Sequence, residues 1–247
     1  MRAKNRFLGI FLMGIAQASL AQISVAGFPI PGHIESPTKG HFVELTLAIA
    51  KEAKLDIDIQ ISPPPRAIEG FMQGKSTVLF PALDVFFPPD HPVVRTKGSF
   101  NCKEDFVFTK KGKPAWRTLD EIKGKRVGLT QGYPYVKEVL ERKDIGFEMA
   151  LSDEANVEKL MKGRLDAFVV EKASGTRAFQ NVNAFADMQV DYKRPVSRQD
   201  VYWAFHDNEE GRALAQKFDK ALFKLYQRPD FFQRFKVGVI EPMGCKK

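Results

Sequence analysis

A short pattern that occurs twice is the feature that most constrains the fold of this chain. Residues 68–75 and 157–164 align at an offset of 89, and Glu, Met and Gly recur at matching positions. In each copy an amphipathic helix ends at a glycine, a basic residue follows, and a buried strand then begins. A unit that occurs once in each half of a chain predicts two lobes of similar construction. The alternative is a chance similarity between two amphipathic helices.

The order of helical and extended segments predicts the fold class. Strands are predicted over 23–26, 55–61, 78–80, 105–109, 126–130, 147–151, 165–170 and 200–205. Helices are predicted over 41–53, 66–73, 119–122, 134–142, 153–162, 174–181, 209–226 and 230–235. We expect the prolines at 63–65 to break the chain, 86–98 to be irregular, and Asp153 to cap its helix. Strands that alternate with helices indicate an α/β fold with mostly parallel sheets flanked by helices.

The first 21 residues have the composition of a cleavable signal peptide. Three basic residues precede an apolar run over 7–16, and Ser19 and Ala21 place small side chains before a cut at Gln22. The run is about half as long as a bilayer requires, which disfavours the alternative of a membrane anchor. The sequence therefore predicts export and a soluble, periplasmic mature chain over residues 22–247.

Export affects how the two cysteines, Cys102 and Cys245, are interpreted. An oxidising compartment permits a disulfide, so a bridge between them is favoured over two free thiols. There is no C-x-x-C motif and the four histidines are scattered, which argues against a redox or metal site. The chain carries a formal charge of +8, but its basic residues are spread along the sequence, so nucleic-acid binding is disfavoured.

The ends of two predicted strands indicate where a ligand would lie. In open α/β sheets the ligand crevice is found beyond the carboxyl ends of the parallel strands. One strand of the repeat ends at Pro81 and Ala82, and its counterpart ends at Glu171. We expect these ends to face one cleft and Glu171 to bind a cationic group of the ligand. The alternative for Glu171 is an ordinary surface glutamate at the end of a strand.

Five further residues are candidates for ligand binding. The turn at Gly132 and Tyr133 leads from a strand into a predicted helix, so free backbone N–H groups would suit an anionic oxygen there. The ring of Tyr133 would also offer a stacking face. Arg66 follows three prolines and Arg95 lies in the irregular stretch, and either could bind a ligand carboxylate or be merely exposed. Phe28 lies in the turn-rich stretch after the first strand.

Several segments, taken in order, resemble bacterial extracellular solute-binding proteins of family 3, which commonly serve ABC importers of polar amino acids. The resemblance covers about residues 23–235, and its most specific part is the run 119–128 followed by Gly132. It is also carried by Gly40 with the helix that contains Glu44, by 65–67, by Gly74-Lys75, and by 163–167.

The resemblance implies a two-lobed, periplasmic-binding-protein-like fold with two hinge strands, near 106–109 and 201–205. Lobe one would comprise residues 22–108 plus 203–247, and lobe two residues 109–202. The ligand would lie at the interface between the lobes.

The resemblance also assigns roles to particular residues. In amino-acid-binding members an Arg after a Thr-Pro-Glu step holds the ligand carboxylate, and an acidic residue after a later strand holds the ammonium. Glu171 matches the acidic position. The chain reads Pro-Pro-Asp-His over 88–91 where Thr-Pro-Glu-Arg is expected, and Thr77 stands where an Asp often follows the glycine step. The carboxylate clamp is therefore moved, to Arg66 or Arg95, or absent.

These observations predict a monomeric periplasmic protein that captures a small polar solute, an amino acid or a related amine or carboxylate, for the permease of an ABC-type importer. Neither a cofactor nor catalysis is expected, since the sequence contains no G-x-S-x-G or H-E-x-x-H motif. One alternative is an enzyme on the same scaffold, either dehydratase-like or peptidoglycan-active. Another is a sensor or partner-binding module without a transport role, which the missing Thr-Pro-Glu-Arg step favours.

Overall fold

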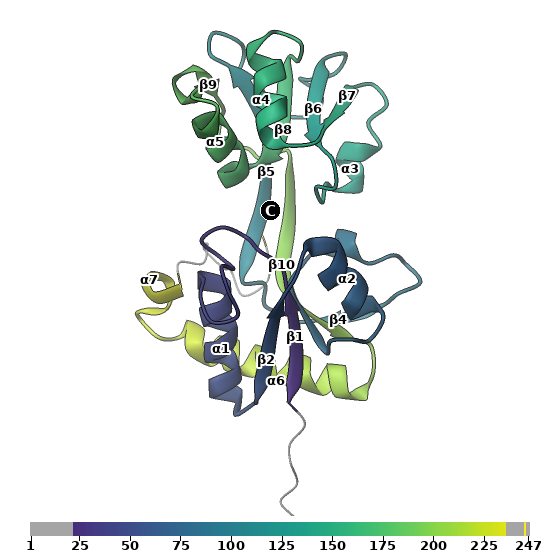
Figure 1. Ribbon diagram of the computed structural model, residues 1–247, viewed down its shortest axis with the longest axis vertical. Helices are drawn as coiled ribbons and strands as arrows, with labels where there is room; N and C mark the ends of the chain where they lie inside the picture. The colour runs from purple at the N-terminus through teal and green to yellow at the C-terminus, as the bar shows by residue number, and fades with distance from the viewer. Residues whose placement is uncertain (1–21, 236–244, 246–247) are drawn as a thin grey trace, which may run out of the picture.

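The computed structural model describes residues 22–235 and residue 245, so the predicted signal peptide lies outside the described residues. The chain forms two lobes joined by two long strands, β5 (Asn101–Lys110) and β10 (Ser197–His206), as Figure 1 shows. The two-lobed α/β fold predicted from the sequence is confirmed. None of the helices in the described part of the chain is long and apolar enough to cross a bilayer.

Lobe one is built from residues near the beginning of the described chain and from the helices that follow β10. Its sheet has the order β2-β1-β3-β10, in which the first three strands are parallel and β10 is antiparallel. The parallel strands are β1 (Ile23–Gly27), β2 (Ile57–Ile61) and β3 (Val78–Ala82), and the short β4 (Val93–Arg95) pairs with β10. The helical segments are α1 (His41–Ala53), α2 (Pro64–Met72), η1 (Asp84–Phe86), α6 (Glu209–Tyr226) and α7 (Phe231–Phe235).

Lobe two repeats this arrangement. Its sheet has the order β5-β8-β6-β7, in which β5 is antiparallel to three parallel strands. These are β6 (Arg126–Thr130), β7 (Gly146–Ala150) and β8 (Ala167–Glu171), and β9 (Met188–Gln189) pairs with the end of β5. The helical segments are α3 (Lys137–Leu140), α4 (Asp153–Met161), α5 (Lys172–Asn181) and η2 (Phe185–Asp187). Since β5 also pairs with β10, one sheet continues through both lobes.

The repeated pattern corresponds to a repeated structure. Helices α2 and α4 start and end 89 residues apart, and so do strands β3 and β8. Gly74 and Gly163 follow the two helices with φ angles of 75° and 70°, a left-handed conformation that glycine adopts without a Cβ penalty. The similarity is therefore not a coincidence of two amphipathic helices.

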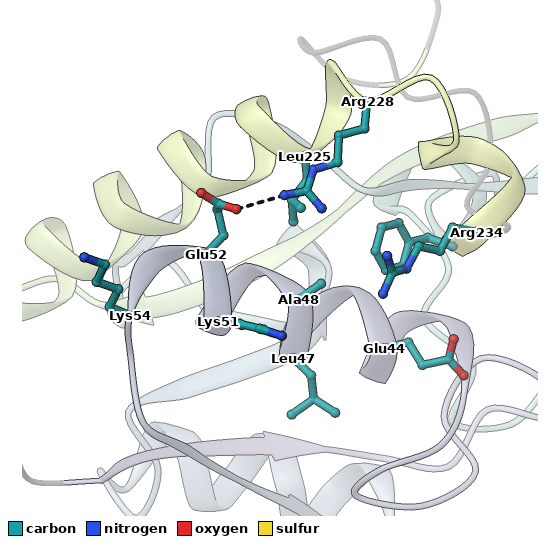
Figure 2. A pocket seen from close by; sticks show the side chains of 10 residues that line it. Glu44, Leu47, Ala48, Lys51, Glu52, Lys54, Leu225, Arg228 and Arg234 are labelled. Carbon is teal, nitrogen blue, oxygen red and sulfur yellow. Dashed lines mark hydrogen bonds and ion pairs between the residues drawn. The ribbon is translucent and has the colours of Figure 1, made fainter.

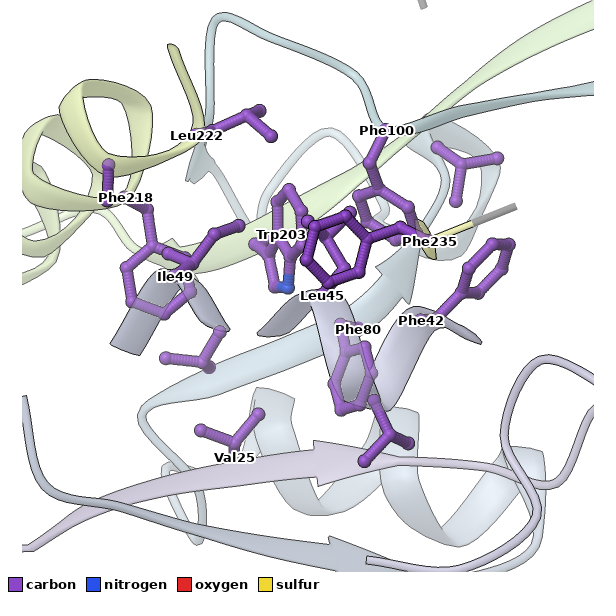
Figure 3. Packing of buried hydrophobic residues seen from close by; sticks show 14 of the residues in the cluster. Val25, Phe42, Leu45, Ile49, Phe80, Phe100, Trp203, Phe218, Leu222 and Phe235 are labelled. Atoms are coloured by element: carbon purple, nitrogen blue, oxygen red, sulfur yellow. The ribbon is translucent and has the colours of Figure 1, made fainter. Parts of the chain in front are cut away.

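The largest apolar cluster lies in lobe one, between its sheet and helices α1 and α6 (Figure 3). Trp203 on β10 is fully buried there, and its indole Nε1 donates to Thr46 Oγ1 at 2.9 Å. The amphipathic helix α1 supplies Leu45 and Ile49, while α6 supplies Phe218. Residues from the beginning and the end of the chain thus share one core.

The core of lobe two has two layers because successive residues of a strand face opposite sides of the sheet. Phe106 and Phe108 of β5 pack with Phe168 and Val170 on one face, against α4 and α5. The alternate residues of β5 and β8 pack on the other face, where Val107, Ala167 and Val169 meet Ile122, Val127, Leu129 and Val139. Both faces are covered, as the near-continuous apolar run of β8 indicates.

The disulfide between Cys102 and Cys245, predicted from the sequence, is confirmed. The two Cα atoms lie 5.3 Å apart and the bridge spans 143 residues of sequence. Cys102 lies on β5 opposite Asp200 of β10. The bridge therefore attaches residue 245 to the pair of strands that joins the lobes.

Three local predictions that concern helices were wrong. Residues 119–122 form turns, since the Glu121 carboxylate accepts the backbone N–H groups of Arg117 and Thr118. The helix predicted over 134–142 is reduced to the four residues of α3. Ser152, not Asp153, caps α4, and its hydroxyl accepts the N–H of Ala155 at 3.1 Å.

The remaining errors concern prolines and strand lengths. Pro64 and Pro65 begin α2 instead of breaking the chain, because the first turn of a helix does not need their missing N–H groups. The stretch 86–98, predicted to be irregular, contains β4. Strands β5 and β10 each extend for ten residues, beyond the predicted 105–109 and 200–205. The lobe boundaries at 108/109 and 202/203 fall within these two strands, and the hinge positions stay a prediction.

Candidate ligand-binding site

The register of the sheet brings the strand ends of both lobes to the same stretch of the molecule. Strand β3 ends at Ala82, opposite Tyr202 on β10, and β8 ends at Glu171, opposite Asp105 on β5. Because Asp105 pairs with Ser197 on β10, the two ends lie five residues apart along β10. That spacing corresponds to about 17 Å in an extended strand. A ligand between the lobes would lie beside this segment of β5 and β10.

On the lobe-one side the predicted residues at the strand ends belong to an apolar cluster. Phe28 is 8% exposed, and its ring meets the ring of Phe86 edge-on at 6.0 Å. Pro81 and Ala82 are buried, and Ala82 packs with Phe28 and Tyr202. These side chains offer shape and apolar contact to a ligand and no hydrogen-bonding group, apart from the Tyr202 hydroxyl.

The two candidate arginines differ in how far their charge is already paired. Arg95 on β4 lies 3.2 Å from Asp84, and its guanidinium carbon lies 5.2 Å from the centre of the Tyr202 ring. The Tyr202 hydroxyl also donates to Asp84, at 2.6 Å. Arg66 is exposed in the first turn of α2 and makes no hydrogen bond or ion pair with any described residue. Of the two guanidinium groups, that of Arg66 is the free one.

On the lobe-two side Tyr133 and Glu171 come together at the start of α5. Glu171 caps this helix, since its Oε2 accepts the N–H groups of Ala173 and Ser174 at 2.8 and 2.9 Å. The Tyr133 hydroxyl lies 3.4 Å from the Ser174 hydroxyl. Glu171 Oε1 accepts no hydrogen bond from a described residue, so half of this carboxylate is available to a ligand. Gly132, with φ at 73°, makes the turn that presents Tyr133.

The centre of this polar face was missed by the sequence analysis. Lys103 Nζ lies 2.6 and 2.8 Å from the two carboxylate oxygens of Asp105, and Ser197 donates to the same carboxylate at 2.6 Å. The ammonium also lies 4.8 Å from the centre of the Tyr133 ring, within the range of a cation–π contact. Burial lowers the pKa of Lys103, and the Asp105 charge opposes that shift.

A pattern in the sequence could have revealed this pair. Lys103 and Asp105 are two residues apart, which places them on one face of a strand. The strand was predicted to begin only at Asp105, so the pairing was not considered. The third partner, Ser197, lies 92 residues away and has no local signal.

The turn after β6 uses part of its backbone hydrogen-bonding capacity within the turn. The N–H of Tyr133 donates to Thr130 O and that of Tyr135 to Tyr133 O, while Pro134 has none. The carbonyl of Pro134 is held by Gln199 Nε2 at 2.7 Å, and α3 begins only at Lys137. The N–H of Tyr133 is therefore occupied, while an anion site at the N–H of Gly132 stays a prediction.

Carboxylates predominate around the turn. Asp153 accepts the Thr130 hydroxyl at 2.5 Å, and burial raises the pKa of Asp153. Asp105 and Glu171 add two more carboxylates beside the ammonium of Lys103. The electrostatics of this face favour a cationic group over an anionic one.

Two surface hollows lie elsewhere, and none of the predicted site residues lines either of them. One, of about 620 Å³, lies between α1, α6 and α7 on lobe one, where Glu52 pairs with Arg228 (Figure 2). The other, of about 520 Å³, lies on lobe two next to Trp116 and Asp166. The strand ends take precedence as the candidate site because they gather convergent polar groups around a buried ion pair. Among the described residues, no group of three or more His, Cys, Asp or Glu could hold a metal ion.

Comparisons with known proteins give a match in structure alone. No protein-family model and no curated protein matches the sequence. A histidine kinase sensor domain with similarity to periplasmic binding proteins has a TM-score of 0.68 and 19% identity, covering 90% of this chain and 98% of that one. The GluR0 ligand-binding core of Nostoc punctiforme, with L-glutamate, has a TM-score of 0.64 and 16% identity over 86% and 96%.

A probable amino-acid ABC transporter extracellular-binding protein of Bacillus subtilis is also similar, with a TM-score of 0.65 and 18% identity over 87% and 95%. The chain thus has the two-lobed fold of the periplasmic-binding-protein class. Within that class it is similar in fold to a probable amino-acid ABC transporter extracellular-binding protein, to a ligand-binding core and to a sensor domain. The predicted resemblance is confirmed at the level of the fold.

Proposed function

We propose that this protein is an extracytoplasmic binding protein that holds a small polar solute between its lobes and delivers it to an ABC-type importer. The observation that carries the proposal is the register of β5 and β10, which sets an apolar strand end of one lobe against a polar strand end of the other. Strands that pass between two lobes can act as hinges, and closure gives a transporter two states to distinguish. The shared fold with amino-acid-binding proteins supports this role.

The residue roles follow from the two faces. Glu171 Oε1 would accept a hydrogen bond from an amine of the solute, and the Tyr133 ring would stack on its apolar part. Phe28, with Pro81 and Ala82 behind it, would close the apolar side. Arg66 is the candidate for a solute carboxylate because its guanidinium is unpaired, while Arg95 and Gly132 would shape the rim.

The sharpest test of these roles is Glu171→Gln. Glutamine keeps an oxygen that can cap α5 but removes the charge, so stability should hardly change. For an amine-bearing solute we expect binding to weaken by about 1.5–3 kcal/mol, which is about 10–150-fold. Isothermal titration calorimetry against amino acids, amines and organic acids measures this. Glu158→Gln, an exposed glutamate of the same lobe, is the matched control, and equal affinity in both variants would refute the role of Glu171.

Lobe closure provides a separate test of the function itself. A bound solute should reduce the radius of gyration measured by small-angle X-ray scattering and raise the melting temperature. If no solute in a broad panel changes either quantity, the binding function is wrong. Turnover of a solute, abolished in Glu171→Ala, would instead favour the enzyme alternative.

A sensor role is the second candidate, favoured by the similarity to a histidine kinase sensor domain over 98% of that chain. A sensor would pass lobe closure to a membrane receptor without releasing the solute to a permease. A stable complex with such a receptor, formed with or without solute, would distinguish it from a transport protein.

A further inference from the structure

Positive charge gathers at the end of lobe two that lies farthest from lobe one, at the top of Figure 1. Three turns meet there, over residues 110–113, 123–126 and 162–164. Each contains a glycine with a positive φ: 86° at Gly112, 70° at Gly124 and 70° at Gly163. Basic residues flank all three glycines, and they are Lys110, Lys111, Lys113, Lys123, Lys125, Arg126, Lys162 and Arg164. We call this surface the basic end.

Hydrogen bonds hold the three turns together as one surface. Lys110 Nζ donates to the Met161 carbonyl at 3.3 Å, which joins the first turn to the end of α4, directly before the third turn. Arg126 Nη2 donates to the Gly163 carbonyl at 3.0 Å, which joins the second turn to the third. The hollow of about 520 Å³ lies between them, with the buried side chains of Leu160 and Leu165 in its lining.

Most of the cations at the basic end form no ion pair with a described residue. Three of its cations form ion pairs: Lys123 with Asp144, Arg126 with Asp166 and Lys162 with Glu158. The other five form no ion pair with a described residue, and they are Lys110, Lys111, Lys113, Lys125 and Arg164. In the hollow on lobe one, by contrast, Glu52 pairs with both Lys224 and Arg228.

Aromatic side chains border the unpaired cations. Lys125 Nζ lies 5.7 Å from the centre of the half-buried Trp116 ring. Phe185 on η2 is 49% exposed, and η2 adjoins the first turn because Lys111 N donates to Asp187 O at 2.7 Å. Lysine and arginine clusters next to aromatic rings are typical of surfaces that bind anionic lipid headgroups.

We propose that the basic end docks the protein onto a membrane surface rich in anionic phospholipid. A protein partner is disfavoured, because a stable protein interface needs about 800 Å² on each side with an apolar centre. The basic end instead spreads its cations over three turns around a small hollow. This inference does not depend on solute binding, since the docking surface and the strand ends lie at opposite ends of lobe two.

The test measures binding of the purified protein to phosphatidylcholine vesicles with and without phosphatidylglycerol. We expect binding only when phosphatidylglycerol is present, and weaker binding as salt shortens the range of the electrostatic attraction. Reversing three of the unpaired charges with Lys111→Glu, Lys113→Glu and Lys125→Glu should weaken binding at least about tenfold. The matched control reverses three exposed lysines of lobe one, Lys75, Lys217 and Lys220.

Several outcomes would overturn the proposal. One is an equal loss of vesicle binding in the two triple variants, and another is equal binding to both kinds of vesicle. A third is binding to polyglutamate but not to vesicles, which would favour a protein partner. Circular dichroism establishes that each variant is folded. If the basic-end variant does not fold, Phe185→Ser and Arg164→Gln replace it, and unchanged vesicle binding in both would equally refute the proposal.

Discussion

The two lobes contain the same unit, 89 residues apart, but its final strand ends in different surroundings. In lobe one, β3 ends at Ala82, which is fully buried among apolar side chains. In lobe two, β8 ends at Glu171, which caps α5 beside Tyr133 and the ion pair of Lys103. The repeat therefore determines the architecture of both lobes. Single residues at matching positions determine which strand end presents polar and charged groups.

Exchanging the matching residues is the strongest way to test this difference. Ala82→Glu would bury an unpaired carboxylate, and we expect the free energy of unfolding to fall by about 4 kcal/mol or more. The reverse exchange, Glu171→Ala, removes the cap of α5 and a charge near the Lys103 ammonium but buries no unpaired group, so it should cost about 1 kcal/mol. Urea unfolding measures both. Similar losses in the two variants would show that the strand ends are not as different as described.

The buried ion pair of lobe two offers the next largest effect. Asp105→Leu leaves the Lys103 ammonium buried without its partner, so we expect a loss of about 3–5 kcal/mol. Adding Lys103→Met removes the orphaned charge and should restore most of that stability. The exposed pair of lobe one is the control, where Arg95→Gln should cost no more than about 1 kcal/mol. A double variant as unstable as Asp105→Leu would contradict this explanation.

Substitution of the two glycines after the repeated helices should lower stability by similar amounts, in contrast to substitution at the two strand ends. Gly74→Ala and Gly163→Ala each place a side chain in left-handed backbone, and no atom lies within 4 Å of either added Cβ. We expect each to lower stability by about 1 kcal/mol, because the cost lies in the backbone conformation itself. Thermal unfolding of the two variants measures it, and a clearly unequal loss would show that the repeat is not equivalent at this point.

The smallest effect is the pH dependence of stability. One buried group in each lobe contributes to it, and the two contributions change with pH in opposite directions. Burial lowers the pKa of His33 in lobe one, so the unfolded state takes up more protons and stability is lost as pH falls below about 6.5. Burial raises the pKa of Asp153 in lobe two, so its contribution is lost as pH rises above about 4.

We expect His33→Phe, which keeps a ring against Phe42, to reduce the loss of stability between neutral pH and about pH 5. The difference should be below about 1 kcal/mol, because the imidazole is only partly buried. Urea midpoints of the wild type and the variant at the two pH values test it. Parallel losses would mean that His33 does not titrate as described.

The architecture could be predicted from the sequence because the repeat and the helical periodicity are local signals. The lengths of β5 and β10 could not, since both begin in polar residues such as Lys103 and Gln199. Alternating apolar residues indicate strands that cover a core. The polar beginnings of β5 and β10 lie between the cores of the two lobes and therefore lack that alternation. The early start predicted for α3 failed for a related reason: Gln199, 65 residues away, holds the carbonyl of Pro134.

The candidate site could likewise be predicted only where it depends on local sequence patterns. The position of Glu171 follows from the end of β8, which local pattern predicts, whereas the contacts that define its surroundings are long-range. Ser197 reaches Asp105 across 92 residues, and Tyr202 reaches Asp84 across 118. No spacing rule connects such residues before the register of β5 and β10 is known.

The division of lobe one between the two ends of the chain has a consequence for the order of folding. Every strand of the lobe-two sheet lies between residues 101 and 189, so that lobe can close with moderate contact order. Lobe one cannot bury Trp203 or pair the second edge of β3 until β10 has been synthesised more than a hundred residues later. The entropy of closing that loop is lost before its core contacts form. The N-terminal half of lobe one is therefore synthesised first and completed last.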